Sequence, residues 1–433
     1  MADGLDVLLW YLYYKYRKPF RSRDKLEHWQ KRRLHRQMRY VSSHIPFYHK
    51  RGKWGTCPVI DKGVWMAHFQ EMNGVGIGRE EAEDFALSAE RSRDFVPRLR
   101  GITVGLSSGT SGRRGVFLIS DQEKNRWAGY ILAKFLPGSI FKRYTIAFFM
   151  RADSNLYQAV SSGRICFHFF DLYGDMEEHL KRLCKMQPDI LAGQPSLLLL
   201  LARERMEGRL DICPRLVISI AEVLEKEDER QLQSAFGLSV IHQVYQCTEG
   251  CLATTCSEGT LHLNEDIVLI EREYLDGQRF VPVVTDLVRR TQPVIRYRLN
   301  DILVERRRPC TCKSPCIALE KIEGREDDIF FFSGREGGMK RVFPDFIRRC
   351  ILFAGSGERN GEYRVVQETD CSITVYADLE EQEKGRVLQE FTRLSDDGGF
   401  VLPAIAFRPY FCEQGRKMKR VERKGICGED TLP

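Results

Sequence analysis

The stretch 101–120, GITVGLSSGTSGRRGVFLIS, carries the first indication of the fold and of its use. Two runs of β-type residues flank a group of small residues, which predicts a strand, a loop and a second strand. The small residues lack the bulk to form a core strand. Their glycines let backbone N–H groups turn toward one concavity, and the hydroxyls and two arginines add donors and charge, so the loop suits a polyphosphate.

The candidate phosphate ligands of this loop are Ser107, Ser108, Gly109, Thr110, Ser111, Gly112 and Arg114. The alternative is an ordinary flexible Gly/Ser loop. The spacing of a Walker loop is absent, and so is the dinucleotide fingerprint. After the second strand, Ser120 and Glu123 form a capping-box pattern, and apolar residues repeat at helical spacing over 127–135. A helix is therefore predicted to begin beside the loop.

The composition is that of a globular chain of 433 residues, 43% of them apolar and 29% charged, which favours two or three domains. A net charge of +7, with bases scattered among almost as many acids, does not indicate a nucleic-acid groove. Fourteen cysteines without an export signal indicate a reducing compartment. We therefore expect a cytoplasmic protein in which clustered Cys and His bind metal rather than form disulfides.

A short apolar run, Val7 to Tyr14, lies near the start of the sequence. It is too short to span a membrane, which requires roughly 20 apolar residues. We expect a packed first helix and no membrane span. The alternative is a membrane-surface role for Leu5 to Tyr16, because this aromatic run leads into Lys15, Arg17 and Lys18.

Between Tyr144 and Leu238, short apolar runs alternate with helical segments, which predicts an α/β sheet with crossover helices. The predicted strands are 145–150, 165–170, 190–192 and 216–220. The predicted helices are 175–186, 196–205 and 225–236, and a surface helix is predicted at 24–42.

Beyond Gly324 the pattern changes to that of a small α+β domain. Strands are predicted at 363–367, 372–376 and 404–410, with a charged helix at 380–393. The best linker lies at 323–328. We therefore predict a large α/β domain with several sheets, residues 1–323, followed by a small mobile α+β domain, residues 324–433.

Four motifs in a fixed order carry a family resemblance. The loop SSGTSG, followed by basic residues and Gly, resembles the phosphate loop of the acyl-adenylate-forming superfamily, which includes acyl-CoA synthetases, luciferases and peptide-synthetase adenylation domains. The segment 244–250, VYQCTEG, resembles the superfamily's aromatic-x-x-Thr-Glu motif. Residues 296–301, RYRLND, resemble its Tyr-x-x-x-Asp motif, and residues 324–328, GREDD, resemble its Gly-Arg-x-Asp hinge.

The resemblance implies a role for each matched residue. Tyr245 would stack on adenine, Thr248 would contact a phosphate and Glu249 would hold Mg²⁺. Asp301 would accept hydrogen bonds from the ribose hydroxyls of ATP, with Arg325 near the same ribose. Taken singly, Asp301 has an alternative as a turn residue, Arg325 as a surface charge and Tyr245 as part of the core.

The chain resembles most the branch that contains phenylacetate-CoA ligase and the coenzyme F390 synthetase. Residues 45–48, 194–196 and 293–297 match that branch, and the resemblance is strongest from 101 to 328. Two departures from the family pattern concern the fine geometry of the site. The phosphate loop has two arginines where many relatives have Pro-Lys, and residues 219–222, SIAE, replace a Gly-rich stretch.

The resemblance also implies a lysine from the small domain that contacts both the carboxylate and the phosphate. Residues 415–421, GRKMKRV, resemble the segment that carries it, which assigns Lys417. The alternative is a solvated basic tail. Joining a carboxylate to the α-phosphate of ATP needs charge neutralisation more than acid–base chemistry, because the attacking carboxylate is already ionised.

A second cluster of residues has the spacing of a metal site. Cys256 and His262 are close in sequence, and Cys310 and Cys312 form a compact pair, with Cys316 as a possible substitute. Three thiolates and one imidazole suit a closed tetrahedral zinc site, which indicates structural Zn²⁺. Some members of the phenylacetate-CoA ligase branch carry zinc at comparable positions. The alternative is free cysteines in a reducing compartment.

We therefore expect a ligase that activates a carboxylic acid as an acyl-adenylate and passes the acyl group to coenzyme A, a carrier-protein thiol or an amine, as a monomer or homodimer. The aromatic run with Phe167, Phe169 and Phe170 suggests an aryl acid, although such runs are more often core. Two alternatives are a synthetase that forms a nucleotidyl ester, like the F390 synthetase, and a relative that binds nucleotide without turnover.

Overall fold

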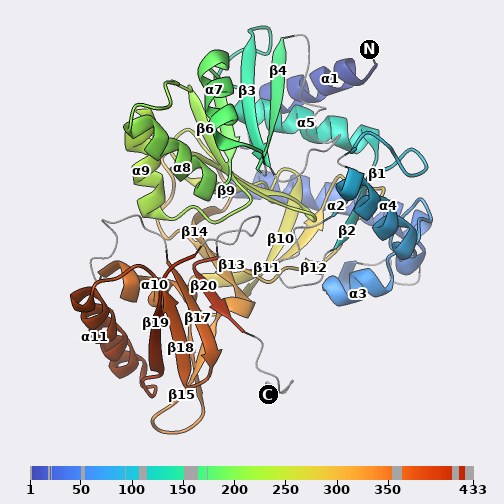
Figure 1. Cartoon of the computed structure of the whole chain (residues 1–433). Helices are drawn as coiled ribbons and strands as arrows, with labels where there is room; N and C mark the ends of the chain where they lie inside the picture. Colours follow the sequence, from blue (N-terminus) through green and yellow to red (C-terminus); the bar gives the residue numbers. More distant parts are fainter. Residues whose placement is uncertain are drawn as a thin grey trace. The chain divides into compact units, whose positions relative to one another are not determined.

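The computed structural model describes residues 2–17, 20, 22–49, 54–92, 94–106, 115–150, 164–172, 174–353, 363–411 and 419–424. The chain divides into two compact units (Figure 1). The first contains Met1–Leu299 and Val304–Lys321, and the second contains Asn300–Leu303 and Ile322–Pro433. The boundary therefore falls two residues before the predicted one at 323, and a short segment around Asp301 belongs to the second unit.

The first unit is built on one large sheet, whose parallel part has the order β7-β6-β5-β3-β4. Its strands are β3 (Tyr144–Met150), β4 (Ile165–Asp171), β5 (Ile190–Gly193), β6 (Leu216–Ile220) and β7 (His242–Cys247). The helices between them are α7 (Met176–Met186), α8 (Pro195–Met206) and α9 (Lys226–Phe236). The predicted alternation of strands and crossover helices is confirmed.

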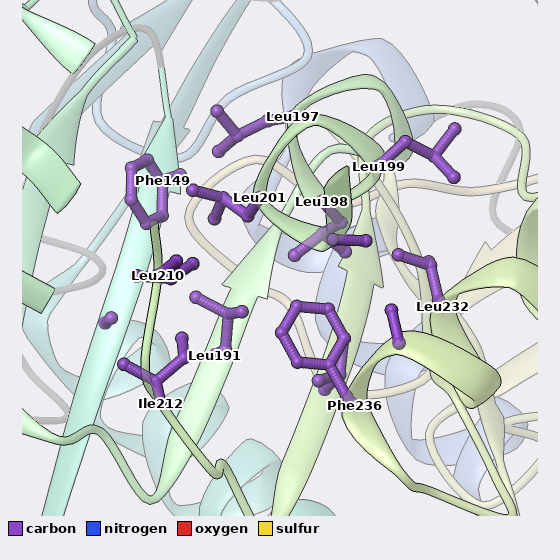
Figure 2. Close-up of a cluster of buried hydrophobic side chains, with 14 of the residues drawn as sticks. Phe149, Leu191, Leu197, Leu198, Leu199, Leu201, Leu210, Ile212, Leu232 and Phe236 are labelled. Carbon is purple, nitrogen blue, oxygen red and sulfur yellow. The ribbon is translucent and has the colours of Figure 1, made fainter. Parts of the chain in front are cut away.

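Both faces of this parallel part are buried, because residues next to each other on a strand point to opposite faces. Phe149 packs on the face covered by α7, α8 and α9 (Figure 2). Phe148 packs on the other face, against α1 (Ala2–Tyr16) and α5 (Asp121–Phe135). Leu198 of α8 is fully buried, so truncating it to Ala would cost about 2–5 kcal/mol of stability.

The rest of the large sheet has the order β10-β11-β13-β14-β9-β8, continues from β8 to β7, and carries β12 beside β11. Its strands are β8 (Gly250–Thr255), β9 (Leu261–Leu263), β10 (Val268–Tyr274), β11 (Arg279–Asp286), β12 (Tyr297–Arg298), β13 (Asp301–Glu305) and β14 (Ala318–Arg325). The chain passes between the two units within β13 and β14.

Helix α1 packs closely on α5. At Gly129 of α5, an added Cβ would lie 2.5 Å from Cβ of Trp10, so only glycine permits this approach. The other early elements are α2 (Arg23–His44), η1 (Pro46–Tyr48), η2 (Trp54–Thr56), α3 (Lys62–Ala67) and α4 (Arg79–Ser92). The predicted packed first helix and the predicted helix at 24–42 are both present.

The second unit is a small α+β domain, as predicted. Its sheet has the order β19-β18-β17-β20, with β17 (Arg364–Thr369), β18 (Ser372–Tyr376), β19 (Ala404–Arg408) and β20 (Val421–Arg423). Its other elements are η3 (Glu326–Asp328), the hairpin β15 (Phe330–Ser333) and β16 (Met339–Val342), α10 (Pro344–Phe353) and α11 (Glu381–Gly398). Across the described residues of both units, no helix combines the length and apolarity that crossing a membrane requires.

Candidate active site

Strand β7 ends at the turn that carries Thr248 and Glu249. Cys247 pairs with Gly250 at the start of β8, so these two residues alone form the turn. Gly250 has φ +155°, which side-chain-bearing residues rarely adopt, and the glycine therefore permits the reversal. Because β7 is parallel to β6, the turn lies at the carboxyl end of parallel strands, where α/β sheets bind ligands.

Strand β7 is only partly covered by protein. Every residue of β5 and β6 is buried, whereas every residue of β7 keeps part of its surface exposed. An edge position does not explain this, since β7 lies between β6 and β8. Tyr245, the predicted adenine-stacking residue, is one of these half-buried residues, and the small Ala253 lies opposite it on β8. Strand β7 therefore keeps some solvent-accessible surface beside Tyr245.

Two hydroxyl groups hold the Glu249 carboxylate. The hydroxyl of Thr248 donates to Oε2 of Glu249 over 2.8 Å. The phenol of Tyr297 hydrogen-bonds the same carboxylate from β12. Burial, followed by the negative charge of Glu249, raises the pKa of Tyr297 well above its usual value, so the phenol stays protonated and donates. Its ring packs edge-on against Trp65 at 5.5 Å.

A buried arginine ties this turn to the strand that follows the predicted phosphate loop. Arg289 donates to the carbonyl oxygen of Thr248 over 2.7 Å and to that of Leu118 over 3.0 Å. Leu118 lies on β2 (Val116–Ile119). Asp286 holds the arginine's own backbone N–H at 2.8 Å. Sequence reasoning missed Arg289, which fixes the Thr248 backbone relative to β2.

Glu123, at the start of α5, also joins two segments that are distant in sequence. The predicted capping box between Ser120 and Glu123 is confirmed. Oε1 of Glu123 also accepts the backbone N–H groups of Arg290 and Thr291, at 2.5 and 2.8 Å. Burial acts to raise the pKa of Glu123, but the hydrogen bonds from Thr291, Arg290 and Ser120 outweigh it and lower that pKa. The loop that carries Arg289 is thereby joined to α5.

One of residues 219–222 has the left-handed backbone conformation, although none of the four is glycine. Ala221 has φ +66°, a conformation that costs an L-residue roughly 1–2 kcal/mol. The next residue, Glu222, accepts hydrogen bonds from the hydroxyl of Ser196, at 2.9 Å, and from its backbone N–H, at 3.3 Å. The departure from the family's Gly-rich stretch therefore leaves a strained residue at the carboxyl end of β6.

In the second unit, the two predicted ribose-binding residues lie together. Nε of Arg325 is 3.3 Å from Oδ1 of Asp301. Asn300 donates through its side-chain amide to Asp327 over 2.8 Å, and its carbonyl accepts the backbone N–H of Glu326 at 2.8 Å. These contacts join the Asp301 segment to the predicted hinge.

The basic residues after 418 are held within the second unit. Nζ of Lys419 lies 2.5 Å from Oδ1 of Asp328, and Nζ of Lys424 lies 2.5 Å from Glu368. Burial raises the pKa of Asp328 in spite of the neighbouring ammonium of Lys419. Lys417 lies outside the described residues, and its predicted role stays a prediction.

The loop 107–114, which contains every predicted phosphate ligand from Ser107 to Arg114, also lies outside the described residues. The strands on either side of it are β1 (Thr103–Leu106) and β2. They pair antiparallel, with Leu106 opposite Val116, which confirms the predicted strand on each side of the loop.

The aromatic run of β4 divides between the two faces of the sheet. Phe170 is fully buried and stacks on Phe149 with ring centroids 4.6 Å apart. Phe170 belongs to the core on the face covered by α7, because successive residues of a strand point to opposite faces. Phe167 and Phe169 are half-buried on the opposite face.

The four predicted metal ligands come together in the first unit. The ligand atoms of Cys256, His262, Cys310 and Cys312 all lie within 4.8 Å of one another. The Sγ atoms of Cys256 and Cys310 are 3.8 Å apart, and Sγ of Cys312 is 3.3 Å from Nε2 of His262. Tetrahedral zinc, with Zn–S bonds of about 2.3 Å and Zn–N bonds of about 2.0 Å, holds its ligand atoms roughly 3.5–3.8 Å apart.

Cys316 orients this cluster instead of joining it. Nδ1 of His262 lies 3.1 Å from the carbonyl oxygen of Cys316, which leaves Nε2 of the imidazole facing the thiols. Burial raises the pKa of Cys312 to about 12. At Cys310, burial is outweighed by hydrogen bonds with Thr260 and the Cys312 backbone, which lower the pKa to about 6.

Comparison with known proteins shows which proteins the chain is similar to. No protein-family profile matches the chain. Protein CapK of Staphylococcus aureus is 27% identical over 169 residues, which cover 38% of this chain and 37% of CapK. The phenylacetate-coenzyme A ligase of Pseudomonas putida is 25% identical over 360 residues, which cover 76% of each chain.

Among solved structures, 2-hydroxyisobutyryl-CoA ligase in the postadenylation state, in complex with 2-HIB-AMP, has the same fold. The TM-score is 0.67 at 17% sequence identity, covering 95% of this chain and 91% of that one. The fold is thus that of an adenylate-forming ligase. In sequence, about three quarters of the chain is similar to phenylacetate-coenzyme A ligases, at 25% identity.

Proposed function

We propose that the chain uses ATP to convert a carboxylic acid into an acyl-adenylate and then transfers the acyl group to a thiol or amine. The observation that carries the proposal is the Thr248-Glu249 turn, held at the open end of β7 by Tyr297 and Arg289. In the first step an oxygen of the acid attacks the α-phosphorus of ATP, and pyrophosphate leaves. In the second, the acceptor attacks the acyl carbon, and AMP leaves.

Different residues of this chain are proposed to bind the adenine, the phosphates and the ribose of ATP. Tyr245 offers an aromatic face to the adenine, and Thr248 a hydroxyl to a phosphate oxygen. Asp301, with Arg325 beside it, offers the acceptor for the ribose hydroxyls. The loop 107–114 is proposed to bind the polyphosphate, and Lys417 to complete the site for adenylation.

Glu249 fits a magnesium ligand. Within the part of the chain that the structure describes, it forms no ion pair, and its partners Thr248 and Tyr297 are neutral. Its charge is therefore left for a cation. Mg²⁺ is commonly held by one or two carboxylates together with substrate phosphates, so a single carboxylate suffices. When bound, the ion would neutralise charge on the phosphates; the residues of this chain hold the carboxylate in place for it.

The acid and the acceptor are proposed by class. Phe167 and Phe169, half-buried on the sheet face that α5 covers, support an apolar substrate, and an aryl acid is our first candidate. Coenzyme A is proposed as the acceptor because the Pseudomonas putida relative is a coenzyme A ligase. A carrier-protein thiol and an amine are the other acceptors to be tested.

We also propose that Cys256, His262, Cys310 and Cys312 bind one structural zinc ion. The spacing of their ligand atoms supports a tetrahedral ion, as does the hydrogen bond that orients His262. Four protein ligands leave no open position, so the ion would stabilise the fold and take no part in the reaction.

Exchange of labelled pyrophosphate into ATP tests this function directly. The purified chain, with Mg²⁺, is assayed across aryl acids, aliphatic acids, amino acids and phenols, each with and without coenzyme A. We expect acid-dependent exchange and the products AMP and pyrophosphate. Glu249→Gln, which removes one charge at almost constant volume, should abolish exchange. Formation of ADP and inorganic phosphate, or exchange that depends only on phenols, would contradict the proposal.

A further inference from the structure

Helix α1 exposes an apolar stripe on the face that points away from the sheet. Leu5, Leu9, Tyr13 and Tyr16 are 60%, 57%, 37% and 68% exposed. Their spacing places them on one side of the helix, while Val7 and Tyr11 on the other side are buried against α5. A helix packed on one side normally presents polar residues to solvent on the other, so both faces of α1 are apolar.

This stripe is held rigidly. Arg126 of α5 donates to the phenol of Tyr14 over 2.7 Å, and its guanidinium lies 4.5 Å from the centre of the Trp10 ring. Beyond the end of the helix, Arg17 forms an ion pair with Asp266 at 3.0 Å. Since these contacts bind α1 along its buried side, the exposed leucines and tyrosines are presented in a fixed arrangement.

The neighbouring sequence is strongly basic. Residues 15–53 contain fourteen Lys and Arg but only two acids, a net charge of +12, whereas the whole chain carries +7. The rest of the chain is therefore net negative, so the positive charge is concentrated in the sequence that follows α1. On α2, four bases at helical spacing are exposed: Lys25, Arg32, Arg36 and Arg39.

The apolar stripe and the basic helix adjoin each other. The guanidinium of Arg17 lies 5.8 Å from the ring centre of Tyr13 and 5.2 Å from that of Trp29 on α2. Arg33 of α2 lies 5.2 Å from the same Trp29 ring. Arg17 therefore lies between the last turn of α1 and Trp29 of α2, which is one turn from Lys25 and Arg32.

We propose that this surface, formed by the exposed side of α1 and the basic side of α2, docks the protein on an anionic lipid bilayer. Apolar and aromatic side chains beside a row of bases are what an interfacial helix needs, because the former enter the acyl boundary while the latter face anionic headgroups. A second copy of the chain is a poor occupant, since a two-fold contact would bring one basic region against another. The docking is independent of the proposed reaction.

Co-sedimentation with vesicles tests the proposal, with phosphatidylcholine vesicles that contain phosphatidylserine compared with pure phosphatidylcholine. The full chain should bind only the anionic vesicles, and binding should weaken at high salt. Each exposed base removed near the surface should weaken binding about fivefold, so Arg32→Glu with Arg36→Glu should reduce it at least 20-fold. Leu5→Gln with Leu9→Gln should reduce it at least tenfold.

Matched controls use helices of the same unit. Lys181→Glu with Lys185→Glu on α7 repeats the charge change at the same spacing, and Met206→Gln removes an apolar side chain that is 67% exposed. Neither should alter vesicle binding. Equal binding by the leucine variants and the unaltered chain would overturn the proposal in favour of a purely electrostatic polyanion site. A dimer in analytical ultracentrifugation that Leu5→Gln with Leu9→Gln dissociates would instead assign the stripe to a second copy.

Discussion

Removing the phenol hydroxyl of Tyr297 should lower the adenylation rate by one to two orders of magnitude. It is 95% buried, remains protonated and hydrogen-bonds the Glu249 carboxylate. A hydrogen bond to a charged group contributes about 1.5–3 kcal/mol. If all of this free energy positions the carboxylate for the reaction, its loss lowers the rate by roughly 10- to 150-fold. Tyr297→Phe removes this bond and keeps the ring, whose edge-on contact with Trp65 at 5.5 Å does not need the hydroxyl.

The assay is pyrophosphate exchange at saturating ATP and acid, with the melting temperature measured on the same sample. Tyr274→Phe is the matched control, because Tyr274 donates to Glu305 over 2.6 Å and its side chain is 50% exposed. We expect the control to retain exchange within about twofold, since exposed hydrogen bonds contribute little. Full exchange activity in a correctly folded Tyr297→Phe protein would refute the idea that this phenol positions Glu249.

Three further predictions follow from the site and its surroundings. Cys310→Ser should release one zinc ion per chain by elemental analysis and lower the melting temperature by roughly 5 °C or more, whereas Cys166→Ser at an exposed position should do neither. Lys417→Ala should depress adenylation by orders of magnitude yet leave transfer from a preformed acyl-adenylate near normal, and equal loss in both half-reactions would indicate misfolding instead. Burial lowers the pKa of His242 below 6.5, so the unfolded chain takes up a proton before the folded one as the pH falls from about 7 to 5. The melting temperature should fall over this range, and less so in His242→Gln.

The parallel half of the large sheet was predictable because short, local sequence patterns identify its strands and helices. Each strand from β4 to β6 is a short apolar run followed by a helix, and this alternation alone implies crossover connections. Strands β8 to β14 left no comparable signal. Several are buried at nearly every position, as β11 is, and so show no alternation of apolar and polar residues. No helix separates them, and their pairing joins segments far apart in sequence, such as β9 with β14.

The candidate site likewise contains residues that short motifs predict and residues that they do not. Thr248 and Glu249 lie in one short motif, and the predicted zinc ligands lie close together in each of their two pairs. Arg289 has no such motif, because its two carbonyl partners lie 41 and 171 residues away along the chain. The contact between Tyr297 and Glu249 likewise joins two motifs that sequence reasoning considered separately. Cys316 could not be distinguished from a zinc ligand until its carbonyl was seen against His262.

The place of the metal cluster explains why this fold would need an ion. From Glu305 to Ala318 no residue is buried, and residues 306–317 form neither helix nor strand. Such a segment has little apolar burial to offset the entropy of ordering it. It nevertheless connects β13 to β14, the strands that bear Asp301 and Arg325. Zinc on Cys310 and Cys312 would fasten this segment to His262 of β9 and so reduce the freedom of the connection between the two strands.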